Sequence, residues 1–226
     1  MKPAFVSWSG GKDCCLACYR AASLGLEVRY LLNMVSEDGQ RARSHGLDAR
    51  WVRRQAEAMG LPIIQQRTSD SEYEVEFKRA LAGFRDMGIT EGVFGDIDFE
   101  EHREWNRRVC AAAGIEMHLP LWQEDQSKLL DEFIRSGFEA MVVTTKAEQL
   151  GKEWLGRKLD RSFAADLAAV EGVTPCGEAG EYHTLVVDGP LFKHRVQIVA
   201  ASPVLKDGYW FLDIKRTRLI PNAQRR

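Results

Sequence analysis

The sequence predicts an α/β protein in which a doubly wound parallel sheet is followed by a smaller α+β domain. Strand-like and helix-like segments alternate at short spacing through the first half of the chain, which is typical of a parallel sheet covered by helices. Most of these helix-like segments stop at a glycine, a common residue just past a helix end. From Tyr182 onward the pattern changes to strands joined by turns. We place the boundary near residues 123–126, which gives domains at 1–124 and 125–226.

Composition limits the class of protein. The chain has 226 residues, 45% of them apolar, which is enough for one large or two small domains. It has no apolar run long enough to span a membrane, and strand-like sequence follows the first lysine, so we expect neither a membrane span nor a signal peptide. Five cysteines, an odd number, do not form an evident disulfide framework, and we expect a reducing cytoplasm.

A net charge of −2 gives no electrostatic signal for nucleic acid, so a nucleic-acid partner is not expected. Five basic residues lie close to the C-terminus. We interpret them as a solvated or frayed end. They are Lys215, Arg216, Arg218, Arg225 and Arg226.

The first strand, turn and helix predict a phosphate-binding loop. Residues 5–8 form an apolar run, residues 9–12 a tight turn, and a helix starts near Asp13. The two glycines of the turn remove Cβ atoms and permit positive φ, so backbone N–H groups and a helix N-terminus can converge on an anion. Lys12 adds a positive charge. Spacing excludes the Walker A loop, which would need a glycine at Val6, and the dinucleotide loop, which needs glycines one residue apart.

The rest of the first half supplies four more strands and three more helices. The helix after the first strand runs to about Gly25, and the helix of residues 48–59 is capped by Asp48 and stopped by Gly60 and Pro62. The helix of residues 73–87 has an apolar stripe and ends at Gly88. The expected strands are 27–35, a strand starting at 63–64, 92–95 and 116–122, and the last helix is 100–113.

The second half is expected to be mixed. We predict helices at 127–136 and 162–170 and strands at 140–145, 182–187 and 196–200. Asp207-Gly208 between residues 204–205 and 209–214 indicates a hairpin.

A parallel sheet binds ligands beyond the carboxyl ends of its strands, where the strand order reverses. With the first strand in a central position, this rim would bring together residues 9–14, 33–34 and Asp96. A carboxylate beside phosphates could hold Mg²⁺, although acidic residues after Asp96 also suit a helix N-terminus, which is our preferred interpretation for Glu100 and Glu101. For Asp96 the two interpretations stay open.

The cysteines after the loop form a lone C-x-x-C at 15–18, without the second pair that a structural zinc site would need. We interpret Cys18 as small apolar packing on a helix face. Cys14 stands in the loop itself, where a helix N-terminus and Lys12 should make its thiol more reactive.

The loop sequence Ser9-Gly-Gly-Lys-Asp-Cys14 resembles the PP-loop of the N-type ATP pyrophosphatases, Ser-Gly-Gly-x-Asp-Ser, with Cys14 in place of the final serine. Three later blocks narrow the resemblance. Together they look like the diphthine–ammonia ligase (diphthamide synthase) family of PP-loop ATPases, over about residues 4–200. The blocks are Trp154-Leu-Gly-Arg-Lys-Leu-Asp160, Cys176-Gly-Glu-Ala-Gly-Glu-Tyr-His-Thr184 and Asp188-Gly-Pro-Leu-Phe-Lys193. Gly92-Val-Phe-Gly-Asp-Ile97 together with His102, Arg103 and Trp105 resembles the bacterial-type members, as does Pro120-Leu-Trp122.

The resemblance implies a domain of the adenine nucleotide α-hydrolase type (HUP, Rossmann-like) and a smaller family-specific domain. The implied reaction is ATP-dependent amide formation: a carboxylate is adenylated with release of pyrophosphate, and ammonia displaces AMP. Positioning and charge neutralisation should carry such a reaction. The implied cofactors are ATP and Mg²⁺, with Asp96 as the metal ligand.

Site residues follow from the same resemblance. The implied catalytic residues are Lys12, Asp13, Glu178 and Glu181. The implied ATP-binding residues are Ser9, Gly10, Gly11, Lys12, Asp13, Cys14, Met34 and Asp96, with Met34 reading adenine through its backbone. The implied acceptor-binding residues are Arg157, Gly177, Glu178, Gly180, Glu181 and His45, although a lone loop histidine is more often simply solvated.

The acceptor is the open point. In archaea and eukaryotes it would be a modified histidine of elongation factor two, and a bacterial enzyme would need another carboxylate. A homodimer is left open. Two other functions stay in view: a PP-loop enzyme that modifies or thiolates tRNA, and a sensor that binds ATP or AMP without turnover.

Overall fold

The computed structural model describes residues 1–44 and 46–222. The chain divides into two compact units. The first unit consists of residues 1–9 and 13–123, and the second of residues 10–12 and the chain from 124 onward. Each unit is described by itself below.

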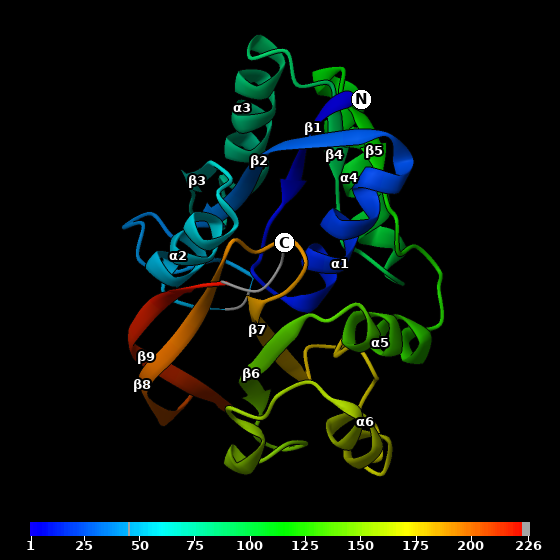
Figure 1. Ribbon diagram of the computed structural model, residues 1–226. Helices are drawn as coiled ribbons and strands as arrows, with labels where there is room; N and C mark the ends of the chain where they lie inside the picture. Colours follow the sequence, from blue (N-terminus) through cyan, green and yellow to red (C-terminus); the bar gives the residue numbers. More distant parts are fainter. Residues whose placement is uncertain (45, 223–226) are drawn as a thin grey trace. The chain divides into compact units, whose positions relative to one another are not determined.

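The first unit is built on a five-stranded parallel sheet in the order β3-β2-β1-β4-β5. This order reverses beside β1, as the predicted doubly wound α/β fold requires, and that prediction is confirmed. Its elements are β1 (Lys2–Ser7), α1 (Lys12–Ala21), η1 (Ala22–Leu24), β2 (Leu26–Val35), α2 (Ala49–Met59), β3 (Ile63–Arg67), α3 (Tyr73–Asp86), β4 (Glu91–Val93), α4 (Glu100–Ala113) and β5 (Glu116–His118) (Figure 1).

Alternation along β1 and into Trp8, the residue that follows the strand, sends side chains to two different cores. Phe5 stacks on Phe84 of α3 with the ring centroids 4.7 Å apart, and it meets Phe94 edge-on at 5.9 Å. Trp8, three residues further, donates from Nε1 to Oε1 of Gln55 on α2 over 2.7 Å, and both side chains are buried. Helices α3 and α2 are therefore anchored to opposite faces of the sheet by residues of opposite parity.

Helix ends in this unit follow the predicted signals. Asp48 caps α2 by accepting a hydrogen bond from the Arg50 N–H over 2.9 Å, and left-handed Gly60 closes the helix. Strand β5 is shorter than predicted, because the chain turns at Leu119, whose carbonyl accepts from the Trp122 N–H, and Pro120 has no N–H to offer a ladder.

The second unit contains an antiparallel sheet in the order β7-β6-β9-β8. It matches the predicted smaller α+β domain. Its elements are α5 (Gln126–Arg135), β6 (Glu139–Lys146), η2 (Lys152–Trp154), α6 (Arg161–Ala168), β7 (Tyr182–Asp188), β8 (His194–Lys206) and β9 (Tyr209–Pro221) (Figure 1).

The hairpin at Asp207-Gly208 is confirmed, with φ of 50° and 80° at the two turn residues, as a type I′ turn requires. Two expectations nearby were wrong. The separate strands predicted at 196–200 and 204–205 are one strand, β8, whose register shifts around Ala200 and so interrupts the alternation. Lys215, Arg216 and Arg218 are exposed and in that sense solvated, but they lie within β9, where Arg216 and Arg218 pair with β8, and do not form a frayed end. Arg225 and Arg226 lie outside the described residues.

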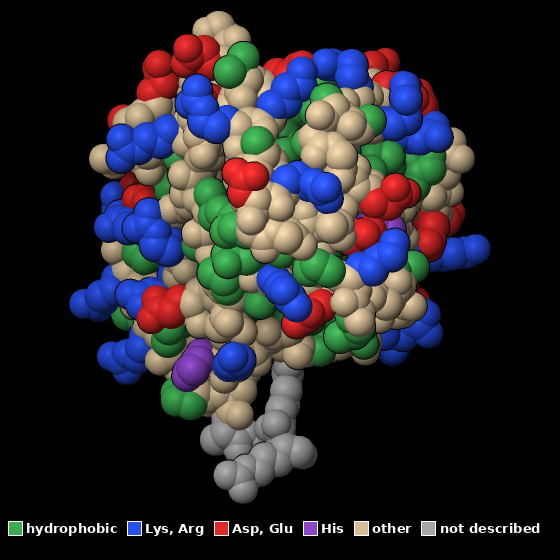
Figure 2. All heavy atoms as spheres, turned by 90° about the horizontal axis from the view of Figure 1, so that it is seen from above, with side chains coloured by type: hydrophobic (Ala, Val, Ile, Leu, Met, Phe, Trp, Pro, Cys, Tyr) green, Lys and Arg blue, Asp and Glu red, His purple; other side chains and the backbone are tan. Residues whose placement is uncertain are grey.

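The face shown in Figure 2 carries Lys and Arg side chains interspersed with Asp and Glu. Such mixing produces no single-sign field on this face. Among the residues that the structure describes, no helix combines the length and apolarity needed to cross a membrane.

Candidate functional site

The predicted phosphate-binding loop lies between β1 and α1, as the sequence indicated. Gly10 takes a φ of +90°, a value that residues with a Cβ rarely adopt, and helix α1 begins at Lys12. The Ser9 hydroxyl donates to Cys14 Sγ over 3.4 Å, and Cys14 is buried. The turn thus places the start of a helix directly after two glycines, which is the arrangement that binds anions.

Loops that follow β1, β2 and β4 meet at the same edge of the parallel sheet. Asn33 donates from Nδ2 to the Trp8 carbonyl over 2.8 Å, so the end of β2 is tied to the approach to the loop. Gly95, after β4, packs on the loop backbone: a Cβ built there would lie 2.7 Å from the Cys14 nitrogen and 2.8 Å from the Asp13 carbonyl carbon. The structure therefore brings residues 13–14, 33 and 95–96 together.

Met34 lies at the end of β2, with its side chain in the aromatic core of the sheet. Its carbonyl accepts a hydrogen bond from the Arg43 N–H over 2.9 Å. His45, the histidine predicted nearby, lies outside the described residues.

Asp96 follows β4, and both of its carboxylate oxygens have a partner on α4. Oδ1 lies 3.1 Å from His102 Nδ1, and Oδ2 accepts from Asn106 Nδ2 over 2.9 Å. Within residues 1–44 and 46–222 no group of three His, Cys, Asp or Glu side chains could hold a metal ion. Since Mg²⁺ is often held by one or two carboxylates together with substrate phosphates, a single carboxylate such as Asp96 is compatible with such a site.

Lys12 is held through both its backbone and its side chain. Its backbone N–H donates to Thr184 Oγ1 over 3.0 Å, and its ammonium donates to the Cys176 carbonyl and lies 5.1 Å from the centroid of the Tyr182 ring. The side chain is only 4% exposed. A carbonyl and an aromatic face both stabilise a buried ammonium, so the charge of Lys12 is fixed in position.

The segment 174–181 folds into tight turns around Glu181. Oε1 of Glu181 accepts from the Thr174 N–H over 2.6 Å, while Oε2 is buried with no hydrogen-bond partner in the described structure. The residue is 1% exposed. Thr145, whose position in β6 pairs with Tyr182, also has a buried hydroxyl without a partner in the described structure. Two unpartnered buried oxygens beside the same strand are costly unless a ligand uses them.

The other residues of the motif build this turn. The Glu178 N–H donates to Thr174 Oγ1 over 2.9 Å, and the Gly180 N–H donates to the Gly177 carbonyl over 3.0 Å. The Tyr182 hydroxyl donates to the Pro175 carbonyl over 2.6 Å. Gly177, Glu178 and Gly180 therefore hold the turn, whatever further role Glu178 has.

His183 follows directly and is partly buried. Burial and the charge of Lys12 lower its pKa to about 4, although Glu181 opposes the shift. The imidazole is therefore neutral at neutral pH, beside the positive charge of Lys12.

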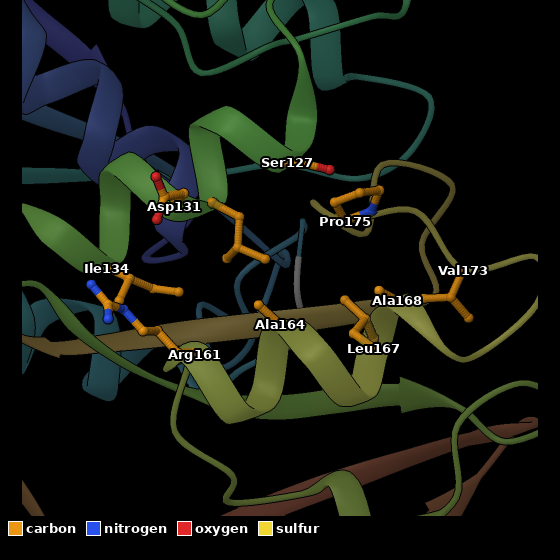
Figure 3. A pocket seen from close by; sticks show the side chains of 10 residues that line it. Ser127, Asp131, Ile134, Arg161, Ala164, Leu167, Ala168, Val173 and Pro175 are labelled. Atoms are coloured by element: carbon orange, nitrogen blue, oxygen red, sulfur yellow. The ribbon is translucent and has the colours of Figure 1, made fainter.

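A pocket of about 280 Å³ lies between α5 and α6 (Figure 3). Figure 3 shows Leu167 and Ala164 of α6 pointing toward α5, with Arg161 and Asp131 at one end and Pro175 at the other. Pro175 belongs to the turn that carries Glu181, so this largely apolar pocket adjoins the motif.

Arg157, a predicted acceptor-binding residue, contacts η2 and α6. Its guanidinium pairs with Asp166 of α6 over 2.6 Å and lies over the Trp154 ring, 4.5 Å from the centroid. The structure gives it a packing role on α6.

All five cysteines are buried thiols that form no disulfide within the described residues. Burial raises the pKa of Cys15 well above its ordinary value and raises that of Cys18 to about 12. Both are poor nucleophiles, because the thiolate is the reactive form.

Sequence reasoning missed three residues that shape the site. Thr184 ends the motif of residues 176–184, and this motif is the sequence signal that could have indicated a role for its hydroxyl at the site. Gln126, whose Oε1 accepts from the Cys176 N–H over 3.0 Å, carries no local signal. Trp105 was noted only as part of a resembling block, and its place beside Asp96 follows from the packing of α3 on α4.

Comparison with known families gives two matches along the chain. The diphthamide synthase N-terminal domain matches residues 1–117, and the diphthamide synthase C-terminal domain matches residues 125–220.

Curated proteins with similar sequences are named diphthine–ammonia ligase. The protein of Schizosaccharomyces pombe is 32% identical over 83% of this chain, which spans only 34% of that longer protein. The protein of Danio rerio is 32% identical over 87% of this chain and 86% of its own length, and that of Homo sapiens 29% identical over 94% and 88%. A solved structure from Methanocaldococcus jannaschii is described as a predicted subunit of tRNA methyltransferase. Its TM-score to this chain is 0.44 at 16% sequence identity, and the match covers 84% of this chain and 98% of that chain.

Proposed function

Because this chain belongs to the diphthamide synthase family, we propose that it is an ATP-dependent ligase that adenylates a carboxylate and then converts it to an amide with ammonia. The observation that carries the proposal is the match of both family domains, in order, over 1–117 and 125–220. The relatives' name, diphthine–ammonia ligase, supplies the class of reaction. The thiolating and sensor alternatives are not favoured, and the raised pKa values of Cys15 and Cys18 also argue against thiolation.

The reaction has two bond exchanges. An oxygen of the acceptor carboxylate bonds to the α-phosphorus of ATP while the bond to the β-phosphate oxygen breaks, so pyrophosphate leaves. The nitrogen of ammonia then bonds to the acyl carbon, AMP leaves with the carboxylate oxygen, and the nitrogen loses one proton. Neither step needs a nucleophilic side chain, so the chain must supply positioning and charge.

For the first step, the N–H groups of residues 9–13 are expected to hold the departing pyrophosphate, with Lys12 as the cation. Lys12 supports this role because Cys176 and Tyr182 hold its ammonium in place before substrate arrives. A preorganised charge costs no reorganisation during the reaction. Asp13, in the first turn of α1, favours the helix start, and Gly95 leaves room for the loop backbone.

For the second step, we assign to Glu181 the binding of ammonium and the removal of its proton. In water at neutral pH ammonia is mostly ammonium, so a base must remove a proton before nitrogen can attack. Glu181 offers a buried oxygen without a partner in the described structure, and its other oxygen is fixed by the Thr174 N–H. A buried carboxylate attracts a small cation and can take its proton. Glu178 is expected to assist from the same turn.

ATP is the expected nucleotide, with Mg²⁺ bound mainly by its phosphates and water. Met34 as the backbone reader of adenine and Asp96 as a metal ligand remain predictions. Arg157 and His45 remain predicted acceptor-binding residues. The acceptor carboxylate is proposed to sit on a protein, such as the modified histidine of elongation factor two, and a reducing cytoplasm is the predicted location.

The direct test incubates the full chain with Mg-ATP, ammonium chloride and candidate carboxylates, and measures pyrophosphate and AMP. We expect both in equal amounts and only with acceptor present. Glu181→Gln should raise the KM for ammonium at least about tenfold with pyrophosphate release retained, because one charge-assisted contact is lost. Release of ADP and phosphate, or ATP binding with no pyrophosphate for any acceptor, would contradict the proposal.

A further inference from the structure

The pocket between α5 and α6 of the second unit has no part in the reaction proposed above (Figure 3). Its volume of about 280 Å³ lies just below the roughly 300–1,000 Å³ of drug-sized sites, so it suits a smaller ligand. Leu130 of α5 and Leu167 of α6 are its buried lining residues, and half-buried Ile134 and Val173 extend the apolar surface.

The pocket exists because α6 presents alanines where α5 presents large apolar side chains. Leu130 and Ile134 are four residues apart on α5, so they share one face of that helix. Ala164 and Ala168 have the same spacing on α6. Methyl groups at these two positions leave open a space that protein interiors normally fill.

One end of the pocket carries a guanidinium without a partner. Arg161 and Asp131 both lie at this end (Figure 3). The Asp131 carboxylate pairs with Arg135, four residues along α5, over 2.6 Å. The Arg161 guanidinium has neither a hydrogen bond nor an ion pair within residues 1–44 and 46–222. The pocket therefore offers apolar walls and one available positive charge.

These features together select an anion with an apolar tail. A guanidinium binds a carboxylate through two parallel N–H···O bonds, and the single negative charge matches that of Arg161. A phosphate dianion would leave excess charge beside apolar walls. An added ammonium group would find Asp131 already paired with Arg135. The ligand class that fits is a small aliphatic monocarboxylate.

The opposite end of the pocket touches the segment that holds two charged groups of the candidate site. Pro175 lines that end (Figure 3). Its two neighbours make the relevant contacts: the Thr174 N–H donates to Glu181 Oε1 over 2.6 Å, and the Cys176 carbonyl accepts from the Lys12 ammonium. A ligand tail packed on Pro175 would thus restrain the backbone that positions both charges.

We propose that this pocket is a regulatory site for a small aliphatic monocarboxylate, with its carboxylate on Arg161 and its tail between α5 and α6. The bound tail favours the position of Glu181 that meets ammonium. The ligand is not the acceptor, because its carboxylate lies at the end of the pocket away from Pro175. The effect on ammonium rests on the proposed function, whereas binding itself does not.

The probe is sodium 4-methylvalerate, titrated into the full chain by calorimetry at constant ionic strength. We expect saturable binding at about millimolar concentration. Acetate lacks the tail and 4-methylvaleramide lacks the charge, so each should bind at least about tenfold more weakly. With saturating 4-methylvalerate, the KM for ammonium in pyrophosphate release should fall about threefold.

Two pairs of variants separate the charge from the space. Arg161→Gln should weaken binding about tenfold and remove the effect on the KM for ammonium. Arg216→Gln removes an equal charge from an exposed position in β9 and should leave the affinity within about twofold. Ala164→Leu should fill the pocket and abolish binding, whereas Ala165→Leu, at an exposed position of α6 outside the lining, should not. Thermal unfolding checks that each variant is folded.

Four results would overturn the inference: no saturable binding, equal affinity for the amide, equal loss in Arg161→Gln and Arg216→Gln, or conversion of the probe to its amide, which would make the pocket an acceptor site. Sedimentation covers one further occupant, since binding lost on dimer formation would make this face an interface between two copies of the chain. Pyrophosphate release without probe binding sinks the inference alone. Probe binding without release for any acceptor sinks the proposed function alone, and binding with an unchanged KM for ammonium sinks the regulatory role.

Discussion

The backbone N–H of Lys12 donates to the side-chain oxygen of Thr184 over 3.0 Å, across a separation of 172 residues. This bond fixes the loop backbone at the residue where α1 begins. The Lys12 ammonium reaches the Cys176 carbonyl in the same region. The predicted phosphate-binding turn is therefore shaped by Thr184 and Cys176 of the segment 176–184 as well as by its own glycines.

Thr184→Val should raise the KM for ATP while leaving the fold intact. Valine has nearly the same shape but cannot accept the hydrogen bond, so we expect the KM for ATP to rise about fivefold to tenfold and stability to fall by about 1 kcal/mol. Steady-state pyrophosphate release and urea unfolding measure the two effects. Thr184→Ser keeps the oxygen and is the matched control; if both variants behave alike, the hydroxyl does not position the loop.

Gly95→Ala should abolish ATP binding by displacing the backbone of the glycine loop. The new Cβ would lie 2.7 Å from the Cys14 nitrogen, and backbone atoms on both sides cannot yield cheaply. We expect loss of ATP binding in calorimetry and destabilisation of about 1–3 kcal/mol. Gly83→Ala is the control, because a Cβ there meets nothing within 4 Å and should stabilise helix α3 by about 0.5–1 kcal/mol. A Gly95→Ala protein with unchanged ATP affinity would show that the loop can move away from β4.

The lowered pKa of His183 predicts that the stability of the protein depends on pH. Its pKa is about 4 in the folded protein and about 6.5 when unfolded, so the unfolded chain binds more protons between these values. Its contribution is complete above pH 6.5 and declines as the pH falls toward 4. Allowing for its partial exposure, we expect the loss to reach about 1–3 kcal/mol.

Thermal unfolding at pH 7.5 and pH 4.5, compared between wild type and His183→Gln, measures this contribution. The wild type should lose more stability than the variant over that interval. An NMR titration of the His183 ring that gave a pKa near 6.5 would remove the basis of the prediction.

Cys14 stands where the PP-loop pattern has serine, and Cys14→Ser should be tolerated. A hydroxyl donates and accepts more strongly than a thiol, so the contact with Ser9 should persist and the KM for ATP should fall by about twofold or more. Cys14→Ala removes the polar atom and should raise this KM. Equal kinetics in the two variants would mean that position 14 only packs. Buried Cys15, Cys18 and Cys110 should stay unmodified by thiol reagents in the native protein.

Much of the first unit could be predicted from local sequence, because its determinants are local. Caps such as Asp48, stops such as Gly60, and the alternation of Phe5 with Val6 each act within a few residues. A central first strand predicts that Asp96 lies on the same rim of the sheet as residues 13–14, and the observed strand order agrees with this placement. The length of β8 was missed because a register shift near Ala200 breaks the alternation on which a strand prediction depends.

The candidate site was only half predictable, because its remaining determinants are long-range. Nothing near Lys12 in the sequence indicates that its ammonium will bind the Cys176 carbonyl, and nothing near Trp105 indicates that it will line a pocket with Tyr73. The motif of residues 176–184 is the feature of the sequence that indicates a catalytic role for Glu181. That one of its oxygens would lack a partner in the described structure follows only from how residues 174–181 turn.

The hydrogen bonds of Gly10 and Lys12 have a consequence for the antiparallel sheet. Strand β7 is an edge strand, and the Gly10 carbonyl accepts from the Val186 N–H over 3.0 Å while the Lys12 N–H meets Thr184. One backbone hydrogen bond and one bond to a side chain thus cover part of the β7 edge. An uncovered edge is a template for pairing with other chains. Because Gly10 and Lys12 belong to the predicted phosphate-binding loop, a loop variant that loses nucleotide binding should also be examined for aggregation.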